Sequence, residues 1–265
     1  MQKKNLSVIL LVGGKGTRLS NIQKKEKQHP KALQKINSKV LISHSMSNFL
    51  KYNYNNFILP IGSYKNIFFN FFKNKKFFCG KKCKIFFSSN DYIKALAKNR
   101  NRINILLLYT GLNVNKANRT MKVINKLNLQ EFILSYGDGV GDINIDNLHK
   151  EHRQSKCFMT VAGIIPYSQY GHFVFDKKNK MVVDFLEKPK LSNWANIGYF
   201  FVKKEAIRYF KKYKDYDLEA GVVKSIAKEN KLLLYKHKGF WKSVDTLKDL
   251  NELSIFLKKN KILFI

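Results

Sequence analysis

The segment LLVGGKGTRLS, residues 10–20, places glycines and fixed positive charges directly after an apolar run. Gly13, Gly14 and Gly16 allow backbone conformations with positive φ and let N–H groups approach an anion closely. Lys15 and Arg18 add cations, and a guanidinium binds phosphate oxygens in bidentate fashion. The spacing fits neither the G-x-x-x-x-G-K-[ST] P-loop nor the G-x-G-x-x-G dinucleotide loop. The segment therefore indicates phosphate binding, with an ordinary strand-to-helix turn as the alternative.

Two aspartates far apart in the chain have the residue type that suits a metal ion. Asp138 follows an apolar run in SYGDG, and Asp245 lies in WKSVDT. Mg²⁺ takes one or two protein carboxylates and fills its other positions with phosphate oxygens and water. Asp-Gly also favours turns, and an aspartate ahead of a helical pattern also serves as a cap. Spacing alone does not choose between these roles.

The first half of the chain alternates strand and helix patterns. Continuous apolar runs that end in glycine or polar residues predict strands, and apolar positions at helical spacing predict helices. The predicted strands are residues 6–12, 55–62, 83–89, 103–111 and 130–139, and the predicted helices are residues 40–52, 66–74 and 120–128. This order predicts an α/β fold, a Rossmann-like, mostly parallel sheet with helices on both faces. Ligands of such sheets bind at the carboxyl ends of the strands, where both the glycine segment and YGDG fall.

The second half is richer in short strands. These are predicted at residues 157–165, 171–176, 181–190, 196–204 and 231–239, with helices at residues 204–213, 218–230 and 246–260. No linker, repeat or low-complexity tract interrupts the chain. We therefore expect one domain over residues 1–265, with an α/β first half at 1–140 and a β-rich second half at 141–265.

Composition limits the partners. The formal charge is +32 over 265 residues, but only six of the 50 basic residues are arginine, and the lysines are scattered over the whole chain. A solvated basic surface explains this better than a nucleic-acid site, because no stacking-aromatic platform or helix-turn-helix pattern is found. Cys79, Cys83 and Cys157 suggest free thiols rather than disulfides or zinc. No window has the roughly 18 apolar residues of a membrane span and no secretory cleavage pattern is seen, so we expect a cytoplasmic protein without membrane contacts.

Several short motifs occur together in one order. They are GGKGTRL, HPKALQKI, YGDGVGDINI, FLEKPK, NIGYFFV and GFWKSVDTLKDL. In order and spacing they resemble the sugar-phosphate nucleotidyltransferase superfamily over residues 6–253. Within it the chain is most similar to the glucose-1-phosphate cytidylyltransferases. The resemblance implies an enzyme that transfers a nucleotidyl group from an NTP, with CTP favoured, to a sugar 1-phosphate, with glucose 1-phosphate favoured, giving CDP-glucose and pyrophosphate. It assigns nucleotide binding to residues 1–140 and sugar-phosphate binding to residues 141–265. Because relatives form homo-oligomers, it also implies that this chain forms one.

The resemblance also assigns roles to particular residues. It implies that Lys31 and Arg18 are catalytic, that Asp138 and Asp245 hold Mg²⁺, and that Glu187 receives the sugar phosphate. Further sugar-phosphate contacts fall on Lys188, Asn196 and Gly198. The implied nucleotide-binding residues are Leu11, Gly13, Gly14, Lys15, Gly16, Thr17, Arg18, Lys31, Thr110, Gly111, Arg119 and Gly137.

The chain departs from the family pattern at a few positions. Val12 stands where relatives have alanine, and His29 where cytidylyl enzymes have lysine. The sugar segment carries Ile197, and the base segment TGLNVNKANR has lost a small hydroxyl residue and two glycines, at Val114, Ala117 and Asn118. Two alternatives therefore stay open: a nucleotidyltransferase of the same fold that uses another NTP or a non-sugar phosphorylated alcohol, and a non-catalytic, basic, nucleic-acid-binding relative.

Overall fold

A single twisted sheet forms the centre of the computed structural model, which describes residues 6–14, 30–74, 84–88, 92–98 and 102–260. Within these ranges the sheet has nine strands. In spatial order they are β14 (Leu232–Lys236), β10 (Met159–Ile164), β13 (Ala195–Val202), β8 (Phe132–Tyr136), β1 (Ser7–Leu11), β4 (Asn56–Ile61), β7 (Arg102–Tyr109), β6 (Tyr92–Lys98) and β5 (Lys84–Ser88).

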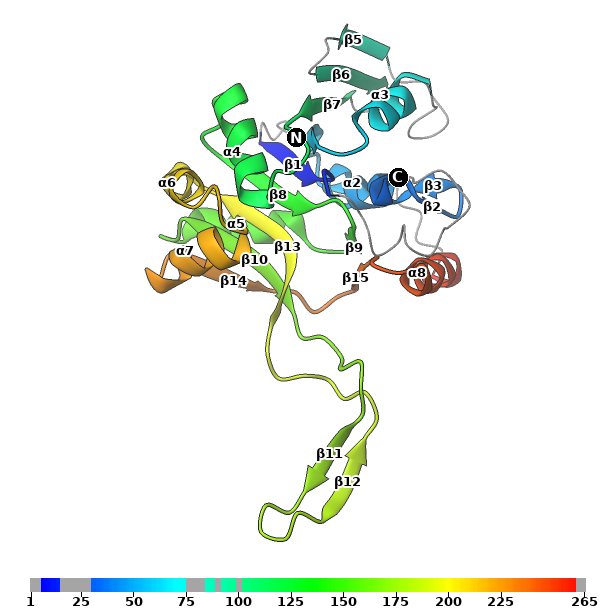
Figure 1. Cartoon of the computed structure of the whole chain (residues 1–265), viewed down its shortest axis with the longest axis vertical. Coiled ribbons are helices and arrows are strands. Elements are labelled where there is room, and N and C mark those ends of the chain that lie inside the picture. Colours follow the sequence, from blue (N-terminus) through cyan, green and yellow to red (C-terminus); the bar gives the residue numbers. More distant parts are fainter. Residues whose placement is uncertain (1–5, 15–29, 75–83, 89–91, 99–101, 261–265) are drawn as a thin grey trace.

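The centre of this sheet, β8-β1-β4-β7, is parallel, as the alternation of strands and helices predicts. Antiparallel pairs flank it, with β13 beside β8 on one side and β6 beside β7 on the other. The strand β6 was not among the predicted elements. Because β10, β13 and β14 come from the second half of the chain, strands of both halves share the sheet (Figure 1).

Helices cover both faces of the sheet, because successive strand residues point to opposite sides. On β1, Val8 and Leu10 pack into one core, whereas Ile9 packs into the other. The first core is covered by α2 (Leu41–Lys51), α3 (Lys65–Asn74) and α5 (Ile145–Gln154). The second is covered by α4 (Lys116–Leu127), α6 (Ile207–Lys212) and α7 (Lys224–Lys228), the last continuing the turn η3 (Glu219–Val223). None of the described helices has the length and apolar character that a membrane crossing requires.

Helix α4 begins four residues earlier than the apolar spacing predicts. Asn115 is its N-cap, and the Asn115 side chain accepts a hydrogen bond from the Asn118 backbone N–H at 2.8 Å. Such a cap satisfies a donor that the first helical turn leaves free. The start of α4 is therefore fixed by a polar cap, next to the loop that leaves β7.

A short ribbon beside the sheet brings the C-terminal part of the chain to the carboxyl end of β8. Strand β9 (Gly139–Gly141) pairs antiparallel with β15 (Trp241–Ser243), which is followed by α8 (Leu247–Lys259). A capping box between Thr246 and Asp249 starts α8. The turn η1 (Lys31–Leu33) and the small hairpin β2 (Lys35–Ile36) and β3 (Lys39–Val40) lie on the same side as this ribbon, since β2 packs against α8 and Ile36 shares a core with Val140 and Val244. The turn η2 (Lys204–Ala206) comes later in the chain, between β13 and α6.

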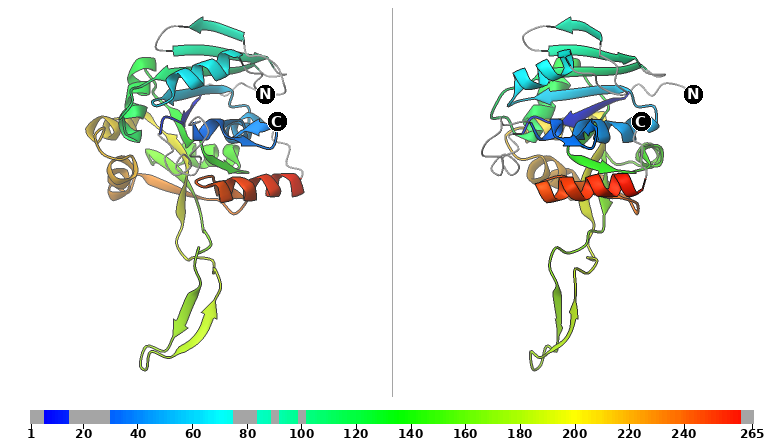
Figure 2. Two further views of the ribbon diagram at one scale, coloured as in Figure 1. Left: turned by 45° about the vertical axis from the view of Figure 1, so that its right-hand side comes forward. Right: turned by 90° about the vertical axis from the view of Figure 1, so that its right-hand side faces the viewer.

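Residues 165–194, between β10 and β13, leave the sheet as an arm. At its end β11 (His172–Phe175) and β12 (Val182–Leu186) pair, among the described strands, only with each other, and Figures 1 and 2 show this hairpin projecting well away from the sheet and its helices. The hairpin is apolar but exposed: Phe173 has 66% of its surface accessible, Val183 65% and Phe185 50%. Two-stranded hairpins are marginally stable in water, so an apolar one that pairs with no other strand of the described residues is unusual.

Candidate active site

A cavity of about 650 Å³ opens at the carboxyl ends of β1 and β8. Sequence segments far apart converge on it: the end of β1, η1, the start of α4, the end of β8 and the residue that precedes the α8 cap. Its lining consists of Leu11, Val12, Gly13, Gly14, Lys31, Ala32, Val114, Asn115, Lys116, Arg119, Tyr136, Gly137, Asp138, Asp217 and Asp245. This is the edge of the sheet at which the parallel strands predict a ligand.

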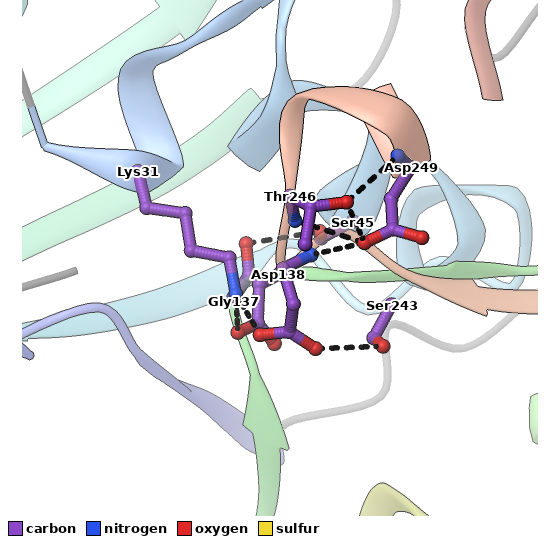
Figure 3. A network of polar contacts seen from close by, with 8 residues as sticks. Lys31, Ser45, Gly137, Asp138, Ser243, Thr246 and Asp249 are labelled. Atoms are coloured by element: carbon purple, nitrogen blue, oxygen red, sulfur yellow. Dashed lines mark hydrogen bonds and ion pairs between the residues drawn. The ribbon is translucent and has the colours of Figure 1, made fainter. Parts of the chain in front are cut away.

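Lys31 lies between the two predicted metal-binding aspartates. Its Nζ donates to Asp138 Oδ2 at 2.7 Å and to Asp245 Oδ1 at 2.8 Å. The Lys31 side chain is 16% exposed, and Figure 3 shows it reaching from η1 toward Asp138. Burial alone would lower the pKa of Lys31, but the charges and hydrogen bonds of the two carboxylates raise it above the usual value for lysine. The ammonium is therefore charged at neutral pH.

Backbone hydrogen bonds place the two carboxylates beside each other. The Val244 N–H donates to the Asp138 carbonyl at 3.1 Å, which continues the register in which Ser243 pairs with Gly139. The Ser243 hydroxyl donates to Asp245 Oδ2 at 3.1 Å, and the Asp245 N–H donates to the Asp249 carboxylate at 3.1 Å. The β9–β15 ribbon and the α8 cap thus fix Asp245 next to Asp138.

The carboxylate pair fits an ion such as Mg²⁺, because one cation already bridges it. In the described part of the chain no three His, Cys, Asp or Glu side chains gather as a closed metal cage. Mg²⁺ is held in many phosphoryl-transfer sites by one or two carboxylates with phosphate oxygens and water as the other ligands. Asp138 and Asp245 match that arrangement, in which a substrate completes the coordination.

Arg119, predicted to bind the nucleotide, lines the cavity, yet its donors are directed at the protein. It donates to the Val114 carbonyl at 3.0 Å, to the Gly111 carbonyl at 3.3 Å and also to the Thr110 hydroxyl. Its guanidinium is so close to Gly13 that a Cβ on this glycine would lie 2.6 Å from it. Burial lowers the pKa of Arg119 below the usual arginine value. Arg119 therefore ties the loop after β7 to the glycine segment after β1.

The other predicted nucleotide residues fall into two groups. Leu11, Gly14 and Gly137 line the cavity, and Val12 packs against Gly137, where an added Cβ would lie 2.5 Å from the Val12 side chain. Thr110 and Gly111 do not line the cavity, but both accept hydrogen bonds from Arg119, which does. Four further predicted residues, and His29, lie outside the described residues; the four are Lys15, Gly16, Thr17 and Arg18.

The predicted sugar-phosphate residues do not line the cavity. Glu187 and Lys188 lie on the arm just after β12, with side chains 64% and 61% exposed, and they form an ion pair with each other at 3.3 Å. Asn196 and Gly198 lie at the start of β13, one layer away from the cavity behind Tyr136. Gly198 has φ of +79°, and a Cβ there would lie 2.3 Å from the Tyr136 ring, so this position requires glycine on structural grounds alone.

A polar group that the sequence did not single out forms the wall opposite Lys31. Lys116 forms an ion pair with Glu219 at 2.6 Å, Tyr136 donates to the same carboxylate, and Asp217 lies 3.6 Å from Lys116. Burial and the contact with Glu219 raise the pKa of Tyr136 above its usual value. The position of Tyr136 directly before Gly137 on the same strand was a usable signal. Nothing in the local sequence marks Lys116, Asp217 or Glu219, because they meet only through the packing of α4 against η3.

Known proteins resemble this chain in sequence and in fold. The sequence pattern of the nucleotidyl transferase family matches residues 7–260. A Bacillus subtilis (strain 168) protein named "Probable glucose-1-phosphate cytidylyltransferase" is 30% identical over 253 residues, 94% of this chain and 95% of that protein. The glucose-1-phosphate cytidylyltransferase of Salmonella typhimurium is 26% identical, over 97% of each chain. The solved inositol-1-phosphate CTP transferase from T. maritima has the same fold, with a TM-score of 0.66 at 13% identity over 99% of each chain.

Proposed function

Because the chain belongs to the nucleotidyl transferase family, we propose that it transfers a cytidylyl group from CTP to glucose 1-phosphate. The products are CDP-glucose and pyrophosphate. One observation carries this proposal: Lys31, Asp138 and Asp245, separated by up to 214 residues in the sequence, meet within 2.8 Å beside the glycine segment in a single cavity.

The reaction requires charge neutralisation more than proton transfer. A phosphate oxygen of the sugar phosphate forms a bond to the α-phosphorus in line with the breaking bond to the pyrophosphate oxygen, and the pyrophosphate leaves as the anion. With a second pKa of about 6, the attacking phosphate monoester is mostly ionised at neutral pH, so no general base is needed. Catalysis then comes from positioning two anions together and from stabilising the charge that develops between them.

The side chains of the cavity supply these contributions. The backbone at Gly14 is open to a triphosphate, since a Cβ there would meet no atom of the described residues within 4 Å. The Lys31 ammonium, at the cavity wall, neutralises charge at the α-phosphate. Mg²⁺ held by Asp138 and Asp245 would supply further neutralisation of the triphosphate as a Lewis acid. Arg119 acts indirectly, because its hydrogen bonds fix the loop of residues 110–114, which would face the base of the nucleotide.

The choice of CTP and glucose 1-phosphate is supported by the two relatives named for this activity, which match almost the whole of this chain. The wall opposite Lys31 suits a polyhydroxylated substrate, since Asp217, Asn115 and the Tyr136 hydroxyl offer several hydrogen-bonding groups. A quaternary ammonium alcohol would suit it less well. The face of Tyr136 is covered by the Lys116 ammonium, 5.2 Å from the ring centroid, and two cations would repel.

We also propose that the protein works as a homo-oligomer, with the arm as part of the interface. The apolar hairpin pairs with no other strand among the described residues, and the arm that bears it also carries Glu187 and Lys188, which are expected to contact the sugar phosphate but lie outside the cavity. A second copy that receives the arm would cover the exposed phenylalanines and bring these two side chains to its own cavity. Mixing inactive Lys31→Ala with inactive Lys188→Ala protein would then restore part of the activity, whereas an arm acting within its own subunit would restore none.

Pyrophosphate release tests the function directly. The full chain is incubated with Mg²⁺, glucose 1-phosphate and each of ATP, GTP, UTP, CTP and dTTP in turn. We expect release with CTP to exceed the others and to stop on addition of EDTA. Equal or absent release with all five nucleotides would overturn the cytidylyl assignment. Replacing the sugar by galactose 1-phosphate, mannose 1-phosphate or phosphocholine then distinguishes a sugar enzyme from one that activates another phosphorylated alcohol.

A further inference from the structure

The lysine of the site has the position that a divalent cation would need. Lys31 Nζ contacts one oxygen of Asp138 and one of Asp245, at 2.7 and 2.8 Å, and is less exposed than either carboxylate: 16% against 35% and 43%. The ammonium reaches this point from η1, a separate segment of the chain. The two carboxylates and the ammonium together carry one net negative charge, so Lys31 already serves as the counter-ion of the pair.

A cation that bridges the two carboxylates competes with Lys31 for the same oxygens. Mg²⁺ binds oxygen at about 2.0–2.1 Å, so an ion that bridges Asp138 Oδ2 and Asp245 Oδ1 would take up the position that the ammonium holds at 2.7 and 2.8 Å from them. Two positive charges in contact with the same carboxylates also repel each other. Lys31 must therefore leave at least one carboxylate before the cation can bridge both, and the cavity that its side chain lines offers the space to turn into.

We propose that Lys31 is an exchangeable counter-ion that makes the site accept a divalent cation and an anionic phosphate ligand together. Without the phosphate, displacement of Lys31 leaves an ammonium without its partners, and cation binding is weak. With a triphosphate in the cavity, the displaced ammonium gains a phosphate partner, and both ligands bind more tightly. By linkage, the cation strengthens triphosphate binding by the same factor. The triphosphate in this scheme rests on the proposed function, whereas the competition between Lys31 and the cation does not.

The test measures cation binding rather than turnover. Mn²⁺ replaces Mg²⁺, and the free ion is followed by electron paramagnetic resonance with full-length protein in the absence of nucleotide. Lys31→Met keeps the length of the side chain and removes its charge. Lys35→Met, at an exposed position of β2, is the matched control. We expect Lys31→Met to bind Mn²⁺ about tenfold more tightly than the wild type, the scale of losing one partly buried ion pair, with Lys35→Met unchanged.

A second measurement tests the coupling. Saturating CTP should tighten Mn²⁺ binding by a larger factor in the wild type than in Lys31→Met, because only the wild type has a displaced ammonium that can pair with the phosphates of CTP. Asp138→Asn should abolish the tight Mn²⁺ site in both backgrounds, which identifies the site measured, and thermal unfolding checks that each variant is folded. Equal or weaker Mn²⁺ binding in Lys31→Met without nucleotide would overturn the proposal, since Lys31 would then not compete with the cation. Failure of the proposed function would appear separately, as absent turnover with every nucleotide while tighter Mn²⁺ binding by Lys31→Met persists.

Discussion

The rim of the cavity and the arm are two regions of one chain with opposite relations to solvent and to the rest of the protein. At the rim, charged side chains are half-buried and paired across 107 and 214 residues of sequence. On the arm, apolar side chains are exposed, and among the described strands β11 pairs only with β12, its neighbour in sequence. The rim is held by the fold that surrounds it, whereas the described contacts of the arm do not explain its stability. The comparison suggests that catalysis belongs to the rim and association to the arm.

The largest effect is expected at the rim. Asp138→Ala removes a carboxylate that contacts Lys31 and should lower kcat by about 10²–10³-fold, the usual cost of losing one electrostatic contact in a transition state. The oligomeric state, measured by light scattering, should not change. Asp215→Asn, on an exposed turn outside the cavity, serves as the control. Unchanged pyrophosphate release by Asp138→Ala would remove the metal-binding role from this residue.

A charge on the arm should have the next largest effect. Phe185→Asp places a carboxylate on the apolar hairpin and should lower the oligomeric mass, with a rise of about 10- to 100-fold in KM for the sugar phosphate and little change in KM for the nucleotide. Light scattering and steady-state kinetics measure the two effects. Asn179→Asp introduces the same charge in the hairpin turn and should change neither. If Phe185→Asp stays assembled with normal kinetics, the arm is not the interface.

The junction between the two regions should respond in stability. Gly198 lies on β13 where the arm rejoins the sheet, and Gly198→Ala both disfavours φ of +79° and drives a methyl group into Tyr136. We expect the free energy of unfolding to fall by about 2–4 kcal/mol in urea titrations. Gly14→Ala, where no atom of the described residues lies within 4 Å of the added Cβ, should lose less than about 1 kcal/mol. Equal losses in the two variants would contradict the role of the Tyr136 contact.

The smallest effect concerns the pH dependence of stability, and it involves the sheet and its helices but not the arm. His152 on α5 is buried against Thr160 of β10, with Nδ1 2.8 Å from the hydroxyl, and burial lowers the pKa of His152 to about 3. In the unfolded chain His152 takes up a proton near pH 6.5, whereas in the folded chain it stays neutral at that pH. The free energy of unfolding therefore falls as the pH drops below about 6.5. Glutamine does not titrate, so between pH 7 and pH 5 the free energy of unfolding of His152→Gln should fall by about 1–2 kcal/mol less than that of the wild type. Parallel losses, measured by urea unfolding at each pH, would contradict this assignment.

Some of the fold could be predicted because the deciding signals are local. The apolar run at residues 6–12 contains β1 (Ser7–Leu11), and the spacing at residues 40–52 contains α2 (Leu41–Lys51). Helix α5 (Ile145–Gln154) was not predicted, because its buried positions include His152 among few apolar residues. The hairpin β11–β12 was expected as strands, but its projection was not, since the partner that decides where an apolar strand packs is not a property of the strand itself.

Part of the candidate site could likewise be predicted from local sequence, and part could not. The glycine segment indicates phosphate binding from its own residue types, whereas Lys31, Asp138 and Asp245 were connected only through the family resemblance. Their meeting depends on the β9–β15 register, which no spacing in the sequence reveals. The motif also could not predict that Glu187 and Lys188 lie on the arm, because a motif gives the order of residues and not their distance from a cavity.

The order of the strands along the chain has a consequence for biosynthesis on the ribosome. Strand β14, the last of the nine in the sheet, ends at Lys236, and Asp245 comes after it. A nascent chain released from the exit tunnel up to that point contains every strand of the sheet and only one of the two carboxylates. The sheet can therefore form during translation before the chain has any means to bridge a cation between Asp138 and Asp245. Competence for catalysis then waits until the residues that follow β14 have emerged and β15 pairs with β9.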